Sequence, residues 1–139
     1  MLQAAQTGNP HTIAKEVSKV PQVYQELKTI VFKSVDEELK TMCRRSENSV
    51  LRKHDYDGLS KLTWKEIFVE IEKNCPTTMH FLITLVNGNL DNTEEKKVPS
   101  ICLMYAIPMF LRVPELSRLQ RLNTVLLTEG GASKMVKYK

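Results

Sequence analysis

The spacing of the apolar residues is the feature of this sequence that most constrains its fold. Between residues 21 and 45 these residues recur mostly at intervals of three and four, which places them along one face of an α-helix. No run of alternating β-branched residues between turn dipeptides competes with this pattern, so the sequence predicts an all-α protein. The apolar positions of this first stretch are Val23, Leu27, Ile30, Val31, Val35, Leu39 and Met42.

The stretch LTWKEIF marks the start of another helix. Thr63 is suited to cap it, and Glu66 follows three residues later to complete a capping box. Leu62 and Ile67 occupy the two positions of a hydrophobic staple. A helix is therefore predicted to begin at Trp64, and we expect this single tryptophan to be mostly buried against its own helix and the central helix.

Prolines set most of the remaining helix boundaries. The helix that begins at Trp64 should end near Asn74, because the residue before Pro76 is disfavoured in helical conformation. The stretch ICLMYAIPMFL is apolar on every side, which is typical of a central helix surrounded by others. Pro108 should kink or end this helix, and Pro114 should start the next one. The predicted helices cover residues 12–20, 21–45, 64–74, 78–86, 99–111 and 114–128.

Length and composition favour one domain. With 139 residues, 42% of them hydrophobic and 26% charged, the chain can bury a core of its own. We expect a single compact helical domain over residues 1–139, a bundle of about six or seven helices around a central apolar helix near residues 99–111. Residues 1–11 are expected to form a flexible N-terminus, and the polar residues 87–98 an exposed loop.

The cysteines and the apolar segments bear on location. Cys43, Cys75 and Cys102 are an odd number at wide spacing, which favours buried or half-buried free thiols in a reducing compartment. No segment reaches the roughly 18 apolar residues of a membrane span, and residues 1–17 lack the apolar centre of a signal peptide. We therefore expect a soluble, intracellular protein with no membrane partner, and the sequence does not separate nucleus from cytoplasm.

No catalytic, cofactor or metal site is predicted, and we expect neither enzyme activity nor a cofactor. In HDYDGLSKL, Asp55 and Asp57 fit inner positions of a calcium loop, but its first and last positions fall on Lys53 and Trp64, which offer no carboxylate. A connecting loop with local turns is the preferred interpretation. The stretch EGGAS lacks the features of a phosphate loop. The potential zinc ligands have no recognised spacing; they are Cys43, His54, Cys75, His80 and Cys102, with His11 remote in sequence.

Positive charge gathers near the C-terminus. Residues 112–139 hold six basic residues against two acidic ones, in a chain whose net charge is +4. The order of helix, glycine turn and basic helix is compatible with a helix-turn-helix, and an ordinary helical hairpin with a solvated basic face is the preferred alternative. The residues that would contact nucleic acid are Arg112, Arg118, Arg121, Lys134 and Lys137.

The order of these motifs resembles a segment of large uncharacterised animal proteins derived from mobile elements. The resemblance covers residues 25–138 and rests on a tryptophan, a glutamate, a proline about a dozen residues after the tryptophan, and a later helical region. Val113 departs from the pattern, which has an asparagine after the arginine. In those proteins the segment precedes a larger domain of unknown function. The matching residues are Trp64, Glu70, Pro76, Leu111, Arg112, Leu126, Leu127 and Gly130.

This resemblance implies that the chain is a fragment of a larger protein, which would explain why residues 132–139 read as an unfinished helix. The expected function is a non-catalytic helical interaction module of a mobile-element-derived protein. Its expected partner is a protein, or the remainder of its own chain. The alternative is a nucleic-acid-binding module that uses residues 112–139.

Overall fold

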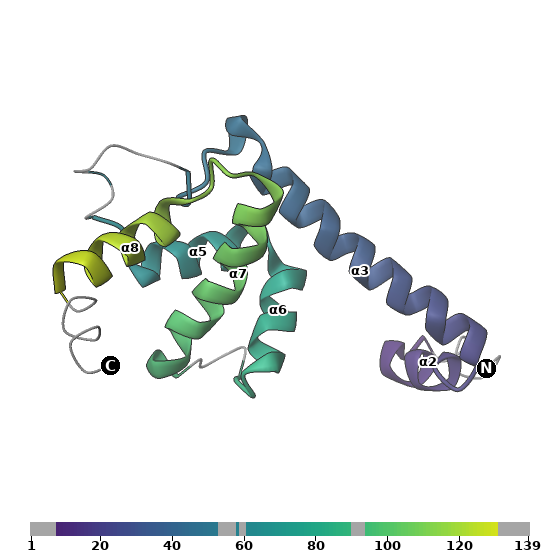
Figure 1. Cartoon of the computed structure of the whole chain (residues 1–139). Helices are drawn as coiled ribbons and strands as arrows, with labels where there is room; N and C mark the ends of the chain where they lie inside the picture. Colours follow the sequence, from purple (N-terminus) through teal and green to yellow (C-terminus); the bar gives the residue numbers. More distant parts are fainter. Residues whose placement is uncertain (1–7, 53–57, 59–60, 90–93, 131–139) are drawn as a thin grey trace, which may run out of the picture. The chain divides into compact units, whose positions relative to one another are not determined.

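The computed structural model describes residues 8–52, 58, 61–89 and 94–130. Every regular element within these ranges is helical, which confirms the all-α prediction (Figure 1). The chain divides into two units, residues 1–37 and 38–139, and each is described here by itself. The expectation of one domain over residues 1–139 stays a prediction.

The first unit contains helix α2 (Pro10–Val17) and most of helix α3 (Pro21–Cys43). Asn9 caps α2, since its Oδ1 accepts hydrogen bonds from the backbone nitrogens of His11 at 3.0 Å and Thr12 at 3.3 Å. A helix is present here as predicted, but it covers Pro10–Val17 rather than residues 12–20. The expected flexibility of residues 1–11 stays a prediction.

The second unit is built around helix α7 (Val98–Arg112), close to the predicted central helix. Helix α7 contacts helices α5 (Trp64–Asn74) and α6 (Pro76–Leu85), and Figure 1 shows α6 and α7 side by side. Helix α8 (Arg118–Gly130) and two short 3₁₀ helices, η1 (Arg45–Glu47) and η2 (Glu95–Lys97), complete the described elements of this unit. The largest fully buried side chains are those of Leu51, Ile67, Ile71, Ile101, Tyr105, Met109 and Leu116.

The capping box at the start of α5 is confirmed. The backbone nitrogen of Glu66 donates to Thr63 Oγ1 at 3.3 Å, and the backbone nitrogen of Thr63 donates to Glu66 Oε2 at 2.9 Å. The end of α5 at Asn74 is confirmed as well, and α6 begins at Pro76, two residues earlier than predicted. Local capping and proline chemistry therefore determine this pair of boundaries.

Trp64 is less completely buried than predicted, because 37% of this residue is exposed whereas the core residues are at most 9% exposed. Trp64 is the first residue of α5, where the Cα–Cβ bond tilts toward the helix N-terminus and carries the ring past the core. The ring lines a cavity of about 400 Å³ together with Phe68, Val98 and Pro99. The backbone of Trp64 does meet the central helix, since its carbonyl oxygen accepts a hydrogen bond from Cys102 Sγ at 3.3 Å.

One proline prediction differs from the structure, and one of two alternatives is excluded for another proline. Pro108 does not end α7, which continues to Arg112. Pro114 does not start α8, which begins at Arg118. The backbone nitrogen of Arg118 donates to the carbonyl oxygen of Leu51 at 3.0 Å, a long-range bond that the local sequence does not reveal.

The predicted loop over residues 87–98 is partly helical, because η2 occupies residues 95–97 and α7 begins at Val98. The side chain of Lys97 reaches back and donates to the carbonyl oxygen of Asn87 at 2.9 Å. The tail at residues 132–139 and most of the HDYDGLSKL stretch, residues 54–57 and 59–60, lie outside the described residues.

Candidate functional site

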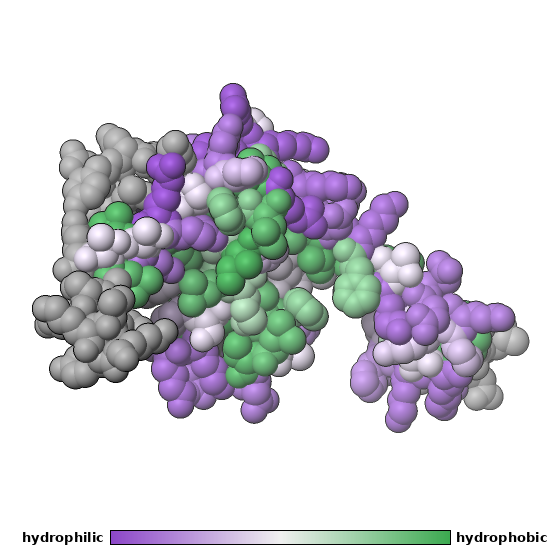
Figure 2. Space-filling model, in the orientation of Figure 1, coloured by the Kyte–Doolittle hydropathy of each residue, from purple (hydrophilic) through white to green (hydrophobic). Residues whose placement is uncertain are grey.

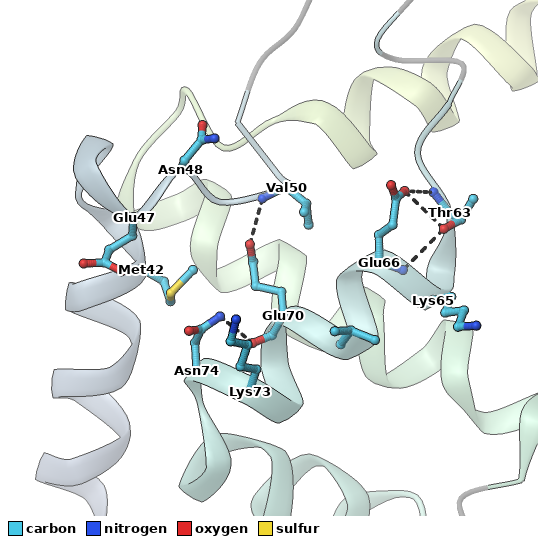
Figure 3. A pocket seen from close by; sticks show the side chains of 11 residues that line it. Met42, Glu47, Asn48, Val50, Thr63, Lys65, Glu66, Glu70, Lys73 and Asn74 are labelled. Atoms are coloured by element: carbon cyan, nitrogen blue, oxygen red, sulfur yellow. Dashed lines mark hydrogen bonds between the residues drawn. The ribbon is translucent and has the colours of Figure 1, made fainter.

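The close-up in Figure 3 shows a shallow pocket of about 450 Å³ between α5 and the segment that follows η1. Lys65, Lys73 and Glu47 supply charge to its wall, and Glu70 lies at its base. Glu70 is only 7% exposed, so the chemistry of the pocket depends on how this carboxylate is bound.

Glu70 is the centre of a buried hydrogen-bond network. Its Oε2 accepts from Ser49 Oγ at 2.8 Å and from the Tyr105 hydroxyl at 2.7 Å, while its Oε1 accepts from the backbone nitrogen of Val50 at 2.7 Å. The Ser49 hydroxyl oxygen in turn accepts from the backbone nitrogen of Leu51 at 3.2 Å. The carboxylate thus joins three parts of the second unit: α5, α7 and residues 49–51. Both carboxylate oxygens accept hydrogen bonds from groups of the protein, which indicates a structural role for Glu70.

Sequence reasoning missed this role of Glu70, although a signal was present. The residue lies three positions after Ile67 and one before Ile71, both of which are fully buried. A carboxylate on the apolar face of a helix needs polar partners, because its burial without them is costly. The same reasoning applies to Glu38, which lies on the apolar face of α3 beside Leu39.

Glu38 caps helix α6 from a distance in the sequence. Its carboxylate accepts from the backbone nitrogens of Thr77 and Thr78, both at 2.9 Å, and from Thr78 Oγ1 at 2.7 Å. Partial burial works to raise the pKa of Glu38, but the hydrogen bonds from Thr78 and Thr77 outweigh it, so the pKa is lowered. A negative charge at a helix N-terminus is stabilised by the unpaired N–H groups there.

The cysteines and the buried tyrosine are not activated for nucleophilic chemistry. Burial raises the pKa of Cys102 to about 12, and burial together with the charges of Glu38 and Glu70 raises the pKa of Cys75 to about 12. Burial also raises the pKa of Cys43. Burial and the adjacent Glu70 carboxylate raise the pKa of Tyr105, so its hydroxyl stays protonated as a donor. All three cysteines are free, with Cys75 and Cys102 buried and Cys43 half-buried, as predicted.

The residues considered as zinc ligands do not come together in the part of the chain that the structure describes. No group of three or more histidine, cysteine, aspartate or glutamate side chains there could hold a metal ion. Cys75 is buried, whereas His80 is exposed. His54 lies outside the described residues.

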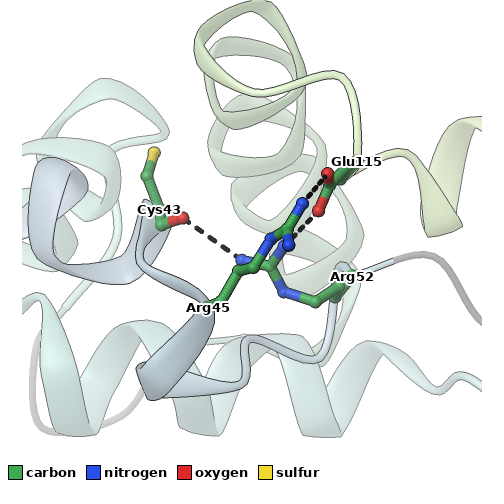
Figure 4. A network of polar contacts seen from close by, with 4 residues as sticks. All are labelled: Cys43, Arg45, Arg52 and Glu115. Carbon is green, nitrogen blue, oxygen red and sulfur yellow. Dashed lines mark hydrogen bonds and ion pairs between the residues drawn. The ribbon is translucent and has the colours of Figure 1, made fainter.

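A second polar network, shown in Figure 4, lies at the surface. Glu115 forms ion pairs with Arg45 and Arg52, each at 2.7 Å, and Arg52 also donates to the carbonyl oxygen of Cys43 at 3.2 Å. Hydrogen bonding to Arg45, and the charge of Arg45, lower the pKa of Glu115. The two pairs join the turn before α8 to the segment after α3. The Arg45 side chain is 82% exposed, so its pair should contribute little to stability, whereas the Arg52 side chain is only 15% exposed.

The residues predicted to contact nucleic acid are placed unevenly. Arg112 and Arg121 are exposed. Arg118 is only 8% exposed, and its guanidinium donates to the carbonyl oxygens of Val50, at 3.1 Å, and Gly58. These two hydrogen bonds hold the segment before α5 against the start of α8. Lys134 and Lys137 lie outside the described residues, so the nucleic-acid surface stays a prediction.

Exposed apolar side chains on α3 form a more coherent surface. Five residues of this helix are 36% to 62% exposed, and we call them the α3 stripe: Val23, Tyr24, Leu27, Ile30 and Val31. Only the last part of the predicted apolar face, at Leu39 and Met42, is buried. None of the residues between 8 and 37 is buried.

Helices α6 and α7 present a second apolar face, where Figure 2 shows hydrophobic residues gathered. Its exposed members are Phe81 and Leu85 on α6 and Ile107 and Leu111 on α7. Ile107 and Leu111 are exposed although α7 is the central helix of this unit.

Comparison with protein-family models, with curated proteins and with solved structures finds no match to this chain. Within the described ranges, no helix combines the length and the apolar character that crossing a bilayer requires. The candidate site therefore rests on the surface features described above. Among these, the α3 stripe is the most sharply defined.

Proposed function

We propose that this chain is a non-catalytic helical interaction module of a mobile-element-derived protein, and that the α3 stripe is the surface through which it binds another protein. The exposure of five apolar side chains on successive turns of one helix carries the proposal. Apolar residues scattered singly over a surface need no explanation, whereas a continuous row of them marks an interaction surface.

The exposure of residues 8–37 supports this role. Helix α3 has an amphipathic face, but no residue of this part of the chain is buried. Packing against a core therefore does not stabilise this face. Most of the stability of a helix in water comes from packing such a face against another surface. A partner would supply that packing.

The chemistry of the second unit agrees with a non-catalytic role. Its buried carboxylate, Glu70, is bound by three donors of the protein, and the thiols of Cys75 and Cys102 have a raised pKa. Three free cysteines are in keeping with a reducing, intracellular compartment. The proposed origin is supported by the resemblance of the order of motifs to mobile-element-derived proteins.

The test compares two variants that change exposed apolar residues of α3 equally. Ile30 is 62% exposed and lies in the α3 stripe, whereas Phe32 is 60% exposed and lies outside it. The tagged chain, Ile30→Glu and Phe32→Glu are each incubated with cell extract, and the bound proteins are quantified. We expect Ile30→Glu to lose proteins that Phe32→Glu retains. Identical sets of bound proteins for the two variants would contradict the proposal.

A further inference from the structure

The residues beside the α3 stripe carry a pattern of charge that identifies a partner. Viewed as a seven-residue repeat with positions a to g, Leu27 takes position a and Ile30 position d, the two core positions of a helix pair. Tyr24 and Val31 then occupy the e positions within the length of the stripe, along one edge of the seam. Glu26 and Lys33 occupy the g positions there along the other edge, and both are exposed.

An antiparallel pair of α3 helices brings these positions into complementary contact. With the two-fold axis between residues 28 and 29, Leu27 of one copy packs against Ile30 of the other, and the reverse contact follows by symmetry. In the same register Tyr24 lies beside Val31 of the second copy, so the e edges are apolar. Glu26 lies opposite Lys33 of the second copy, so the g edges contain two pairs of opposite charge.

A parallel pair has less of this complementarity. Its edges would join each g position to an e position of the second copy, which places Glu26 opposite Val31 and Lys33 opposite Glu38. The Glu38 carboxylate is already bound by Thr77 and Thr78 at the start of α6. A parallel pair would also stack Glu37, at a d position, on Glu37 of the second copy, and like charges in such a seam repel. The sequence of α3 therefore distinguishes the two orientations.

We propose that the partner of the α3 stripe is a second copy of this chain, held by antiparallel pairing of the two α3 helices. This inference rests on the proposed function and specifies its partner. The five side chains span about two and a half helical turns, which makes a small interface. We expect the pairing to be weak accordingly.

The apolar part of the seam is tested by sedimentation of the full chain over a range of concentrations. We expect a monomer–dimer equilibrium for the wild type and for Phe32→Glu, because position f faces away from the seam. Ile30→Glu should stay monomeric throughout. Both residues are largely exposed, and unchanged helical circular dichroism of each variant shows that the fold is retained.

The charged edges are tested by exchanging the two charges. Glu26→Lys and Lys33→Glu should each weaken the dimer about tenfold, because each change turns two attractive pairs into repulsive ones. The double variant Glu26→Lys/Lys33→Glu should restore the wild-type affinity. The change Glu72→Lys on α5, at an exposed position remote in sequence from α3, is the charge-matched control and should have no effect.

The outcomes of these experiments separate the claims. A wild type that stays monomeric, or a dimer that Ile30→Glu leaves intact, overturns the self-pairing. A dimer that Ile30→Glu abolishes but that the double charge exchange does not restore overturns the antiparallel register. A monomeric wild type whose cellular partners are still lost in Ile30→Glu overturns the self-pairing alone and leaves the proposed function standing. Restoration by the double exchange supports the pairing as stated.

Discussion

The hydroxyl of Tyr105 donates a hydrogen bond of 2.7 Å to Glu70 Oε2, and this contact joins the central helix α7 to α5 inside the second unit. Both residues are buried, Tyr105 at 1% exposure and Glu70 at 7%. The bond is one of three that converge on the same carboxylate, so the packing of these helices depends on a polar group.

Removing this carboxylate should destabilise the fold strongly. Glu70→Ala leaves the donors of Ser49, Val50 and Tyr105 without their acceptor, and we expect a loss of about 3 kcal/mol or more in the free energy of unfolding. Tyr105→Phe removes one bond and should cost about 1.5 to 3 kcal/mol. Denaturant unfolding measures both, and Glu72→Ala, an exposed change on the same helix, should stay within about 0.5 kcal/mol of the wild type. A loss for Glu70→Ala no larger than that of Glu72→Ala would refute the role of the network.

The cap of Glu38 on α6 should make stability depend on acid pH. The pKa of Glu38 is lowered from its ordinary 4.5 in the folded chain, so its contribution is fully present above that value and is lost as the pH falls through the folded pKa. Glu38→Gln should therefore be less stable than the wild type at neutral pH, and the difference should shrink in acid. Thermal melting at a series of pH values measures this. A difference that does not change with pH would exclude a charged cap.

The cap of α5 allows a smaller and more local test. Thr63→Ala removes the oxygen that accepts from the backbone nitrogen of Glu66 and should cost about 1 kcal/mol, while Thr63→Gly should cost less because glycine tolerates the cap conformation. The two variants are compared with the wild type by denaturant unfolding. Equal stability of all three would show that the capping box contributes nothing.

The partial exposure of Trp64 reduces the expected effect of its removal. Because 37% of the residue remains in solvent, Trp64→Ala should cost less than the roughly 3 to 5 kcal/mol typical of a fully buried aromatic residue. Its fluorescence maximum should lie between those of buried and fully exposed indoles, and should shift to the red on unfolding. A maximum typical of a fully apolar environment would contradict the observed placement.

The features that the sequence predicted correctly are those with local causes. The helical period, the capping box at Thr63 and the break at Pro76 depend on residues within one or two turns of each other. The features it missed depend on partners far along the chain. Arg118 begins α8 where its backbone meets Leu51. The cap that Glu38 makes on α6 joins residues 40 positions apart, and the bond from the Val50 nitrogen to Glu70 joins residues 20 positions apart. The exposure of the α3 stripe is of the same kind, because periodicity shows which face is apolar but not what covers it.

Amide hydrogen exchange across residues 21–37, measured at rising concentrations of the full chain, tests most directly whether the α3 stripe is an interaction surface. In dilute solution these amides should exchange readily, since no residue of this stretch is buried. Their protection should increase as the chain becomes concentrated, and the increase should be absent in Ile30→Glu and present in Phe32→Glu. Strong protection that is the same at every concentration would show that the stripe is already covered within the chain, and would contradict the account.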